Sequence, residues 1–502
     1  MTAKISSKSV QRFLKNREVR FGTSGIRGLA SNLTDRLCYA FTCAFIHHLE
    51  NLGELRRGDQ VSVGGDLRAS TARIIKAVMQ AIGDCGMKFH YSGRLPSPAL
   101  CYFGMKHGLP TIMVTGSHIP ADRNGIKFTR KKGEITKADE AAILSQPLDI
   151  PSGLFDREEN LKTRCKLPAA DEQPVVEYMQ RYLDFFPEGV FSGLRLGVYQ
   201  HSSVGREIFP ELLRRLGAHV EELGWAKNFV AVDTEALDQR IVEAARDWCR
   251  KRRLFALVTA DGDADRPLVA DENGNWLRGD TAGLLCAVQL GIKALAVPIS
   301  CSTAIEKTGF FQKVVRTRIG SPYVIEGMRR LSAPTVAGFE ANGGFLIQTP
   351  LSRNGRRLDA LPTRDAAIVH LAVIERAVEK RCRLSELTRD FPQRFTFSDH
   401  LKNFPQEMGR QFVEELISFG GLNPKNIDEN LVRLCGEMVS LDSTDGVRLM
   451  FERGDIVHLR PSGNAPEFRC YSESETEARA RKLCRLGLQW VEKWLSQRPT
   501  TG

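Results

Sequence analysis

The sequence VTGSHIPADRNGIKF, residues 114–128, surrounds one serine with groups that can support chemistry at its hydroxyl. Ser117 follows an apolar run at residues 111–114. His118 is its neighbour, and Lys127 lies beyond an Asp-Arg-Asn-Gly turn. A serine hydroxyl becomes a nucleophile when a base or a cation activates it, but serine is also common in polar turns. The loop by itself leaves both interpretations of Ser117 open.

A second loop, ADGDADRP, places three carboxylates at alternating positions after an apolar run at residues 254–258. Asp261, Asp263 and Asp265 repel one another unless the loop curls around a shared cation. No histidine or cysteine lies nearby in the sequence, which disfavours a transition metal. Because Mg²⁺ needs few protein oxygens and accepts phosphate oxygens as further ligands, we predict a magnesium site.

The same aspartates, together with Glu272, match ligand positions of a calcium-binding EF-hand loop. The context of the loop disfavours this alternative. Arg266 stands where an EF-hand requires glycine, and Pro267 follows it. The preceding run also has the pattern of a strand rather than a helix.

A third loop, GFEANGG at residues 338–344, contains Glu340 and Asn342 between glycines. A carboxylate accepts two hydrogen bonds and an amide both donates and accepts, so the pair can bind sugar hydroxyls. A helix-capping turn explains the sequence about as well.

A fourth loop, RPSGNAPEFR, offers the donors that hold a phosphate. These donors are an arginine fork, a hydroxyl and backbone amides, and they belong to Arg460, Ser462, Gly463 and Asn464. An ordinary surface turn is the alternative.

Alternating strands and helices position these loops. Three stretches repeat a β-like run, a Gly/Ser loop, an amphipathic helix and a second β-like run, which predicts parallel sheets covered by helices in successive domains. They are strand 60–63, helix 71–83 and strand 87–91; strand 194–199, helix 205–216 and strand 220–223; and strand 294–299, a helix and strand 314–318. The last hundred residues differ. Short apolar runs before a helix at 475–494 predict a small α+β domain.

The composition narrows the setting and the partners. The formal charge of +11 arises from dispersed basic clusters without interleaved aromatic residues, which argues against nucleic acid and suits a solvated surface or a small polyanionic ligand. Twelve scattered cysteines indicate reduced thiols and give no support for redox chemistry. The apolar runs are too short to span a membrane, and the basic N-terminus fits a solvated arm better than a transit peptide. We therefore expect a soluble, cytoplasmic protein.

Taken in order, the loops resemble the motifs of the α-D-phosphohexomutase family over nearly the whole chain. The matches are FGTSGIRG at residues 21–28, the serine loop at 115–120 and 124–127, the metal loop at 261–266, the sugar loop at 338–344 and the phosphate loop at 460–466. Five motifs in the correct order are very specific, whereas any one of them alone is not.

The resemblance implies an α/β fold of four domains around a central cleft. The first three domains share a mixed topology in which helices cover a sheet, and the last is a smaller α+β domain. Their expected bounds are residues 1–167 with the phosphoserine loop, 168–270 with the metal loop, 271–392 with the sugar loop and 393–502 with the phosphate loop. A monomer or a homodimer is expected.

The resemblance also implies a phosphohexomutase that interconverts hexose 6-phosphate and hexose 1-phosphate. Ser117 is then a stored phosphoserine, and Mg²⁺ is held by one of its oxygens together with Asp261, Asp263 and Asp265. A hexose 1,6-bisphosphate is both the intermediate and the activator. The other implied roles are proton transfer by Lys127 and His118, charge stabilisation by Arg27 and Arg266, sugar binding by Glu340 and Asn342, and phosphate binding by Arg460, Ser462, Gly463 and Asn464.

Several positions depart from the family pattern. Gly116 replaces alanine, Ala264 replaces glycine, Asn342 replaces serine, and Gly344 stands where histidine is common. Within the family the chain is most similar to bacterial phosphomannomutases that feed GDP-mannose synthesis, with phosphoglucomutase and phosphoglucosamine mutase as alternatives. Two hypotheses from other classes remain open, a phosphatase that forms an aspartyl phosphate on Asp261 and an inactive sugar-phosphate binding protein.

Overall fold

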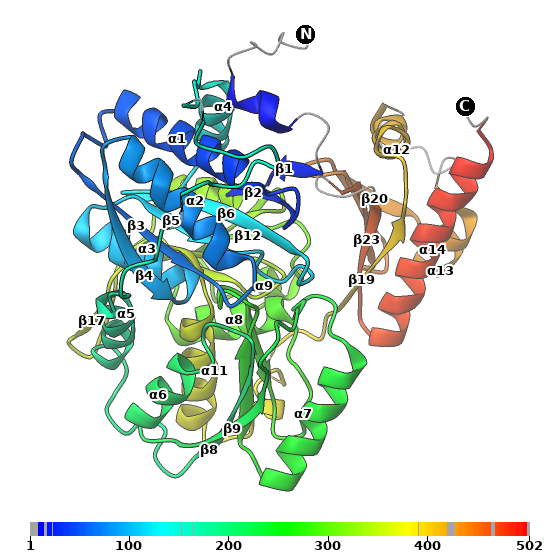
Figure 1. Ribbon diagram of the computed structural model, residues 1–502. Helices are drawn as coiled ribbons and strands as arrows, with labels where there is room; N and C mark the ends of the chain where they lie inside the picture. Colours follow the sequence, from blue (N-terminus) through cyan, green and yellow to red (C-terminus); the bar gives the residue numbers. More distant parts are fainter. Residues whose placement is uncertain are drawn as a thin grey trace. The chain divides into compact units, whose positions relative to one another are not determined.

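The computed structural model describes residues 9–14, 18–22, 24–151, 153–163, 165–389, 391–418, 427–462 and 467–498 (Figure 1). The chain divides into two compact units. The first consists of Met1–Ile292 and Ser332–Leu387, and the second of Lys293–Leu331 and Thr388–Gly502. Among the helices of the described residues, none combines the length and the apolar composition needed to cross a bilayer.

The first unit begins with a mixed seven-stranded sheet. In spatial order its strands are β1 (Val19–Phe21), β2 (Gly25–Leu29), β6 (Arg123–Arg130), β5 (Thr111–Val114), β3 (Gln60–Gly65) and β4 (Lys88–Arg94), and β7 (Gly133–Glu134) pairs with β6. The strands β3, β4 and β5 are parallel, whereas β5, β6, β2 and β1 pair antiparallel. The antiparallel pairing places Gly25 of β2 opposite Lys127 of β6, which brings two sequence motifs together.

Helices with apolar faces build the core beside this sheet. They are η1 (Val10–Leu14), α1 (Asp35–Asn51), α2 (Thr71–Asp84), α3 (Ser97–His107) and α4 (Lys137–Ser145). Helix α1 begins where the Thr34 side chain accepts a hydrogen bond from the Leu37 N–H, and it buries Phe45 in a stacked contact with Phe128 of β6. This core holds the strand ends, and therefore the loops between them, in place.

A second sheet of the first unit has the order β11-β10-β8-β9. Its strands are β8 (Arg195–His201), β9 (His219–Trp225), β10 (Ala256–Ala260) and β11 (Pro267–Ala270), and its helices are α5 (Gln173–Leu183), α6 (Ile208–Arg215) and α7 (Gln239–Arg252). The strands β8, β9 and β10 are parallel, and β11 returns antiparallel with Ala260 opposite Pro267. Residues 261–266 are therefore the loop of a tight hairpin that follows a strand.

The rest of the first unit carries the sugar loop. It contains α8 (Gly279–Gln289), β14 (Val336–Phe339), β15 (Phe345–Ile347), β16 (Leu351–Arg353), β17 (Arg356–Leu358), β18 (Leu361–Asp365), α11 (Ala366–Lys380) and η2 (Leu384–Glu386). Phe339 of β14 lies opposite Phe345 of β15, so residues 340–344 form a hairpin loop. Next to it, β15 pairs antiparallel with β18.

The second unit combines a parallel strand pair with an antiparallel sheet. The first part has β12 (Ala294–Pro298), α9 (Ala304–Lys307), β13 (Lys313–Thr317) and α10 (Ser321–Arg329). The second part has β19 (Phe395–Lys402), α12 (Gln406–Ser418), α13 (Glu429–Cys435), β20 (Met438–Asp442), β21 (Val447–Phe451), β22 (Ile456–Pro461), β23 (Glu467–Ser474) and α14 (Glu477–Ser496). Its sheet order is β19-β23-β22-β21-β20, and every pair in it is antiparallel.

The predicted α/β class is confirmed, with one correction in detail. The repeated strand and helix units predict parallel sheets, but antiparallel strands such as β6 and β11 extend the parallel cores. A hairpin needs only a short loop, and the serine loop and the metal loop each connect the two antiparallel strands of a hairpin. The helix expected after residues 294–299 is only the short α9. The four domain bounds stay a prediction.

Candidate active site

The serine loop connects β5 to β6 and holds Ser117 fully buried, in a left-handed backbone conformation with a φ of 55°. The Ser117 N–H donates to Thr115 Oγ1 at 2.8 Å, and its hydroxyl donates to Asp261 Oδ2 at 2.5 Å. Nδ1 of His118 lies 3.4 Å from the same hydroxyl oxygen. A positive φ is costly for a residue with a side chain, so surrounding contacts must hold it. The geometry favours a positioned nucleophile over a residue in a solvated turn.

Those contacts come from Arg68 and Asp66, two residues that the sequence analysis did not single out. Nη2 of Arg68 donates to the Ser117 carbonyl at 2.9 Å and to the Ile119 carbonyl at 2.6 Å, and Nη1 donates to the Pro120 carbonyl at 2.5 Å. Nε of Arg68 donates to Asp66, whose carboxylate also accepts from Thr115. Arg68 is 1 % exposed. A buried guanidinium that uses its donors on one loop fixes the position of that loop.

The Arg68 side chain also explains why residue 116 is glycine. A Cβ at Gly116 would lie 2.6 Å from both Cζ and Nε of Arg68.

We expect Gly116→Ala to lower turnover by about tenfold and to destabilise the fold by about 1–3 kcal/mol, because a buried, fully bonded guanidinium cannot move aside. The control is Gly83→Ala on α2, where a Cβ meets no atom within 4 Å and stability should not fall. Steady-state kinetics and thermal denaturation measure both effects. Wild-type turnover in Gly116→Ala would contradict this role of Arg68.

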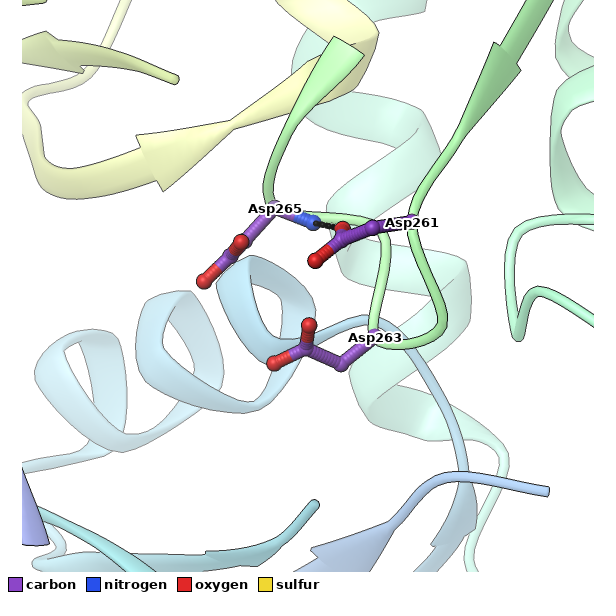
Figure 2. Close-up of side chains that lie close together, drawn as sticks. All are labelled: Asp261, Asp263 and Asp265. Carbon is purple, nitrogen blue, oxygen red and sulfur yellow. Dashed lines mark hydrogen bonds between the residues drawn. The ribbon is translucent and has the colours of Figure 1, made fainter. Parts of the chain in front are cut away.

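The three aspartates of the metal loop converge in the structure. Figure 2 shows their carboxylates on one loop, with the N–H of Asp265 donating to Asp261. One oxygen from each lies within 4.8 Å of the others, and all three residues are buried. Within the described residues, Oδ1 of Asp263 and Oδ1 of Asp265 are buried without a hydrogen-bond partner. Such oxygens are unfavourable unless a cation binds them, and an all-oxygen set of this size fits Mg²⁺.

Lys127 supplies a positive charge beside this triad. Its Nζ donates to Asp263 Oδ2 at 2.5 Å and to Asp265 Oδ2 at 2.7 Å. Burial favours the neutral amine, but the two carboxylates outweigh it and raise the pKa of Lys127. Burial and the charges of Asp263 and Asp265 raise the pKa of Asp261 well above its ordinary value. Lys127 thus balances part of the negative charge of the triad.

Further cations lie around the same loops. Arg27 stands on β2, the neighbour of β6, and the side-chain Nε of Arg266 lies 3.8 Å from Asp265 Oδ1. Burial and the charges of Arg266 and Arg364 lower the pKa of Arg27 to about 10. Burial, Arg266 and Arg27 lower the pKa of His118 well below its ordinary value, so its imidazole is neutral at pH 7. Cations this close repel one another and favour an anion between them, as a phosphoryl group would be.

The sugar loop is joined to the metal loop by Arg364, another residue missed from the sequence. Nη1 of Arg364 donates to Glu340 Oε2 at 3.0 Å, and Nη2 donates to Asp265 Oδ2 at 2.9 Å. Gly344 makes room for it, since a Cβ there would lie 2.6 Å from Cγ and Cδ of Arg364. Glycine thus replaces the histidine that is common at position 344, and the Arg364 side chain occupies the space that a side chain there would need. Asn342 uses its Oδ1 to accept from the Gly344 N–H at 2.9 Å.

We expect Arg364→Lys to lower kcat/KM by about 10- to 100-fold, the effect of losing one or two charge-assisted hydrogen bonds of about 1.5–3 kcal/mol each. Lysine keeps the charge but has no fork with which to bind two carboxylates at once. Arg353→Lys is the matched control, because Arg353 binds the Glu375 carboxylate and lies over the rings of Phe185 and Phe186, outside the site. Equal kinetics for the two variants would rule out the coupling of the two loops through Arg364.

The predicted phosphate loop belongs to the second unit. Arg460 is the penultimate residue of β22, with its Nε 3.4 Å from Asp445 Oδ1, and the Ser462 N–H donates to the Glu467 carbonyl at 2.8 Å. Gly463 and Asn464 lie outside the described residues. The role of these four residues stays a prediction.

Models of three family domains match this chain. The phosphoglucomutase/phosphomannomutase alpha/beta/alpha domain I matches residues 18–150, domain II matches residues 178–274 and domain III matches residues 278–395. The chain belongs to the phosphoglucomutase/phosphomannomutase family. This membership confirms the predicted α-D-phosphohexomutase family and a phosphotransferase of the mutase class.

Relatives in this family match over almost the full chain. A phosphomannomutase of Salmonella muenchen is 39% identical, with 91% of this chain and 92% of the relative covered. A phosphomannomutase of Sinorhizobium fredii is 40% identical, with 93% and 98% covered. The solved structure of a family protein from Burkholderia thailandensis has a TM-score of 0.71 at 17% identity and covers 94% of this chain and 97% of its own, which supports the fold.

Proposed function

We propose that the protein interconverts mannose 6-phosphate and mannose 1-phosphate through a phosphoserine at Ser117 and a hexose 1,6-bisphosphate intermediate. The observation that carries the proposal is the contact between the Ser117 hydroxyl and Asp261, inside a triad of buried carboxylates of which two oxygens have no hydrogen-bond partner in the part of the chain that the structure describes. The choice of mannose rests on the two relatives near 40% identity, which are both phosphomannomutases.

In the first half-reaction, a hydroxyl of the sugar monophosphate attacks the phosphoryl group on Ser117. The bond from phosphorus to Ser117 Oγ breaks, a bond to the sugar oxygen forms, and the proton of the sugar hydroxyl must leave. His118 and Lys127 are the candidates to move that proton, since His118 Nδ1 lies 3.4 Å from Oγ and Lys127 contacts the adjacent carboxylates. Arg27 and Arg266 stabilise charge on the transferring group.

In the second half-reaction, the bisphosphate turns around and returns its other phosphate to Ser117. Asp261, Asp263, Asp265 and an oxygen of the phosphoserine would hold Mg²⁺, and this ion supplies Lewis-acid activation of the phosphoryl group when bound. Hexose 1,6-bisphosphate acts as the activator because it restores the phosphoserine if the intermediate escapes. A cytoplasmic location and small sugar phosphates as the partners complete the proposal.

The test is an assay of the purified protein with mannose 1-phosphate, glucose 1-phosphate and glucosamine 1-phosphate, each with the matching bisphosphate. We expect the highest kcat/KM with mannose 1-phosphate. A higher value with glucosamine 1-phosphate would favour phosphoglucosamine mutase, and no conversion of any of the three would overturn the proposal.

Sugar selectivity should depend on Asn342. Its Oδ1 closes the loop turn, so its NH2 group is the part able to face a ligand, and serine can close the same turn with its hydroxyl. Mannose and glucose differ in the orientation of one hydroxyl. We expect Asn342→Ser to change the ratio of kcat/KM for the two sugar phosphates by about 3- to 10-fold. Arg460→Ala is the comparison, because loss of a phosphate contact should weaken both substrates equally. An unchanged ratio in Asn342→Ser would remove Asn342 from sugar discrimination.

A further inference from the structure

Two cysteines that are far apart in the sequence lie on α1 and at the C-terminal end of α2, two helices of the first unit that pack against each other. Cys43 lies on α1 and is 2 % exposed, whereas Cys85 caps the C-terminal end of α2 and is partly exposed. On α1, Tyr39 lies one turn before Cys43 and His47 one turn after it, and the Tyr39 hydroxyl donates to Asp84 Oδ2 at 3.0 Å. Cys43 therefore faces the end of α2 where Cys85 lies. On the other side, Nε2 of His47 lies 3.9 Å from Cys85 Sγ. Cys85 therefore sits between a second thiol and an imidazole.

The surroundings favour the thiolate form of Cys85. The neighbouring Cys43 thiol, followed by the contact with His47 and its charge, outweighs burial and lowers the pKa of Cys85 to about 6. The contact with Cys85 raises the pKa of His47. The neighbouring Cys85, together with burial, raises the pKa of Cys43. Other groups face the cluster. The carboxylate of Glu50 raises the pKa of Cys85, and that of Asp84 raises the pKa of Cys43. The Tyr39 hydroxyl lies near Cys43, and the Arg57 side chain lies against Gly86.

We propose that Cys85 is a peroxide-reactive thiol and that Cys43 resolves its oxidised form into a reversible disulfide. The Cys85 thiolate attacks one oxygen of a peroxide, the O–O bond breaks, and Cys85 becomes a sulfenic acid while hydroxide or alkoxide leaves and takes a proton from solvent. The Cys43 sulfur then attacks the sulfenic sulfur, the S–S bond forms, and water leaves with the Cys43 proton. A thiol reductant restores both cysteines.

The arrangement assigns a different task to each residue. A thiolate that is partly exposed can meet a peroxide, whereas a buried thiol in contact with it can react only with Cys85. The imidazole of His47 stabilises the thiolate before attack. The inference does not rest on the proposed function, because thiol chemistry can be measured without any substrate.

Peptide mapping of the full-length protein tests the proposal. The protein is treated with stoichiometric hydrogen peroxide, blocked with N-ethylmaleimide and digested without reduction. We expect a Cys43–Cys85 linked peptide that disappears after dithiothreitol, and no such peptide in Cys85→Ser. In Cys43→Ala we expect dimedone to capture a sulfenic acid on Cys85. Both thiols recovered as maleimide adducts in the wild-type protein would overturn the proposal, even if neither variant folds.

The reactivity of Cys85 is tested separately with iodoacetamide at pH 7. Cys165 and Cys382 are the internal controls, because these are the other two cysteines that are not buried. We expect Cys85 to be alkylated about tenfold faster than either control, and His47→Gln to remove most of that difference. Equal rates for the three cysteines in the wild-type protein would show that the cluster does not activate Cys85.

Discussion

Replacing Asp263 with asparagine is expected to lower turnover by several orders of magnitude while the fold is retained. Asparagine has nearly the same shape, so it can still accept from Lys127 and Ser97, which contact Oδ2 of Asp263. What it removes is one charge and the buried Oδ1 that has no donor among the described residues. The loss should therefore fall on cation binding and phosphoryl transfer rather than on packing.

Two measurements separate these effects. Titration calorimetry with Mg²⁺ should show weaker binding in Asp263→Asn, and thermal denaturation should show a similar Tm without the ion. The matched control is Asp271→Asn. Asp271 is also buried, and in a turn beyond the hairpin its Oδ1 accepts from the Asn273 and Asn275 N–H groups while its Oδ2 accepts from the Asn275 side-chain amide. Because an asparagine oxygen can replace only one of these two acceptors, its variant should lose some stability and not Mg²⁺ affinity. Wild-type turnover in excess chelator would contradict the metal site altogether.

The loops of the candidate site could be predicted from the sequence because their polar residues lie close together in short segments. Three aspartates within five positions indicate a cation site without further information. The pairing of β10 with β11 then places them at a strand end. Ser117 was ambiguous alone. Its assignment depends on Asp261, a residue that only the fold brings within 2.5 Å of the hydroxyl.

The residues that hold the loops could not be predicted in this way. Arg68 and Arg364 look like ordinary basic residues in the sequence, and their roles follow from complete burial and from the carbonyl and carboxylate oxygens around them. The only sequence signal was indirect. Glycine at positions 116 and 344 departs from the family pattern, and each glycine leaves the space that one of these arginines occupies.

The same limit applies to the cysteines and to Ala264. Scattered thiols give no pattern in the sequence, yet the packing of α1 on α2 makes Cys43 face Cys85. Ala264 has a φ of 57° where the family has glycine, so the metal loop keeps a strained turn by its own contacts, at a cost of about 1 kcal/mol. Local propensity predicts neither result, because long-range packing decides both.

The phosphorylated residue decides between a mutase and a phosphatase that uses an aspartyl phosphate. Incubation with a hexose 1,6-bisphosphate labelled in its phosphates should label the protein at Ser117, and the label should survive neutral hydroxylamine, which cleaves acyl phosphates but not serine esters. Ser117→Ala should abolish the label and lower turnover by several orders of magnitude, since the covalent intermediate cannot form. The matched control is Ser97→Ala. Ser97 donates to Asp263 Oδ2 at 2.6 Å in the same site, so its variant tests whether any nearby hydroxyl suffices, and it should keep the label. A hydroxylamine-labile label that persists in Ser117→Ala would assign the phosphoryl group to Asp261 and reverse the roles of the serine and the carboxylate.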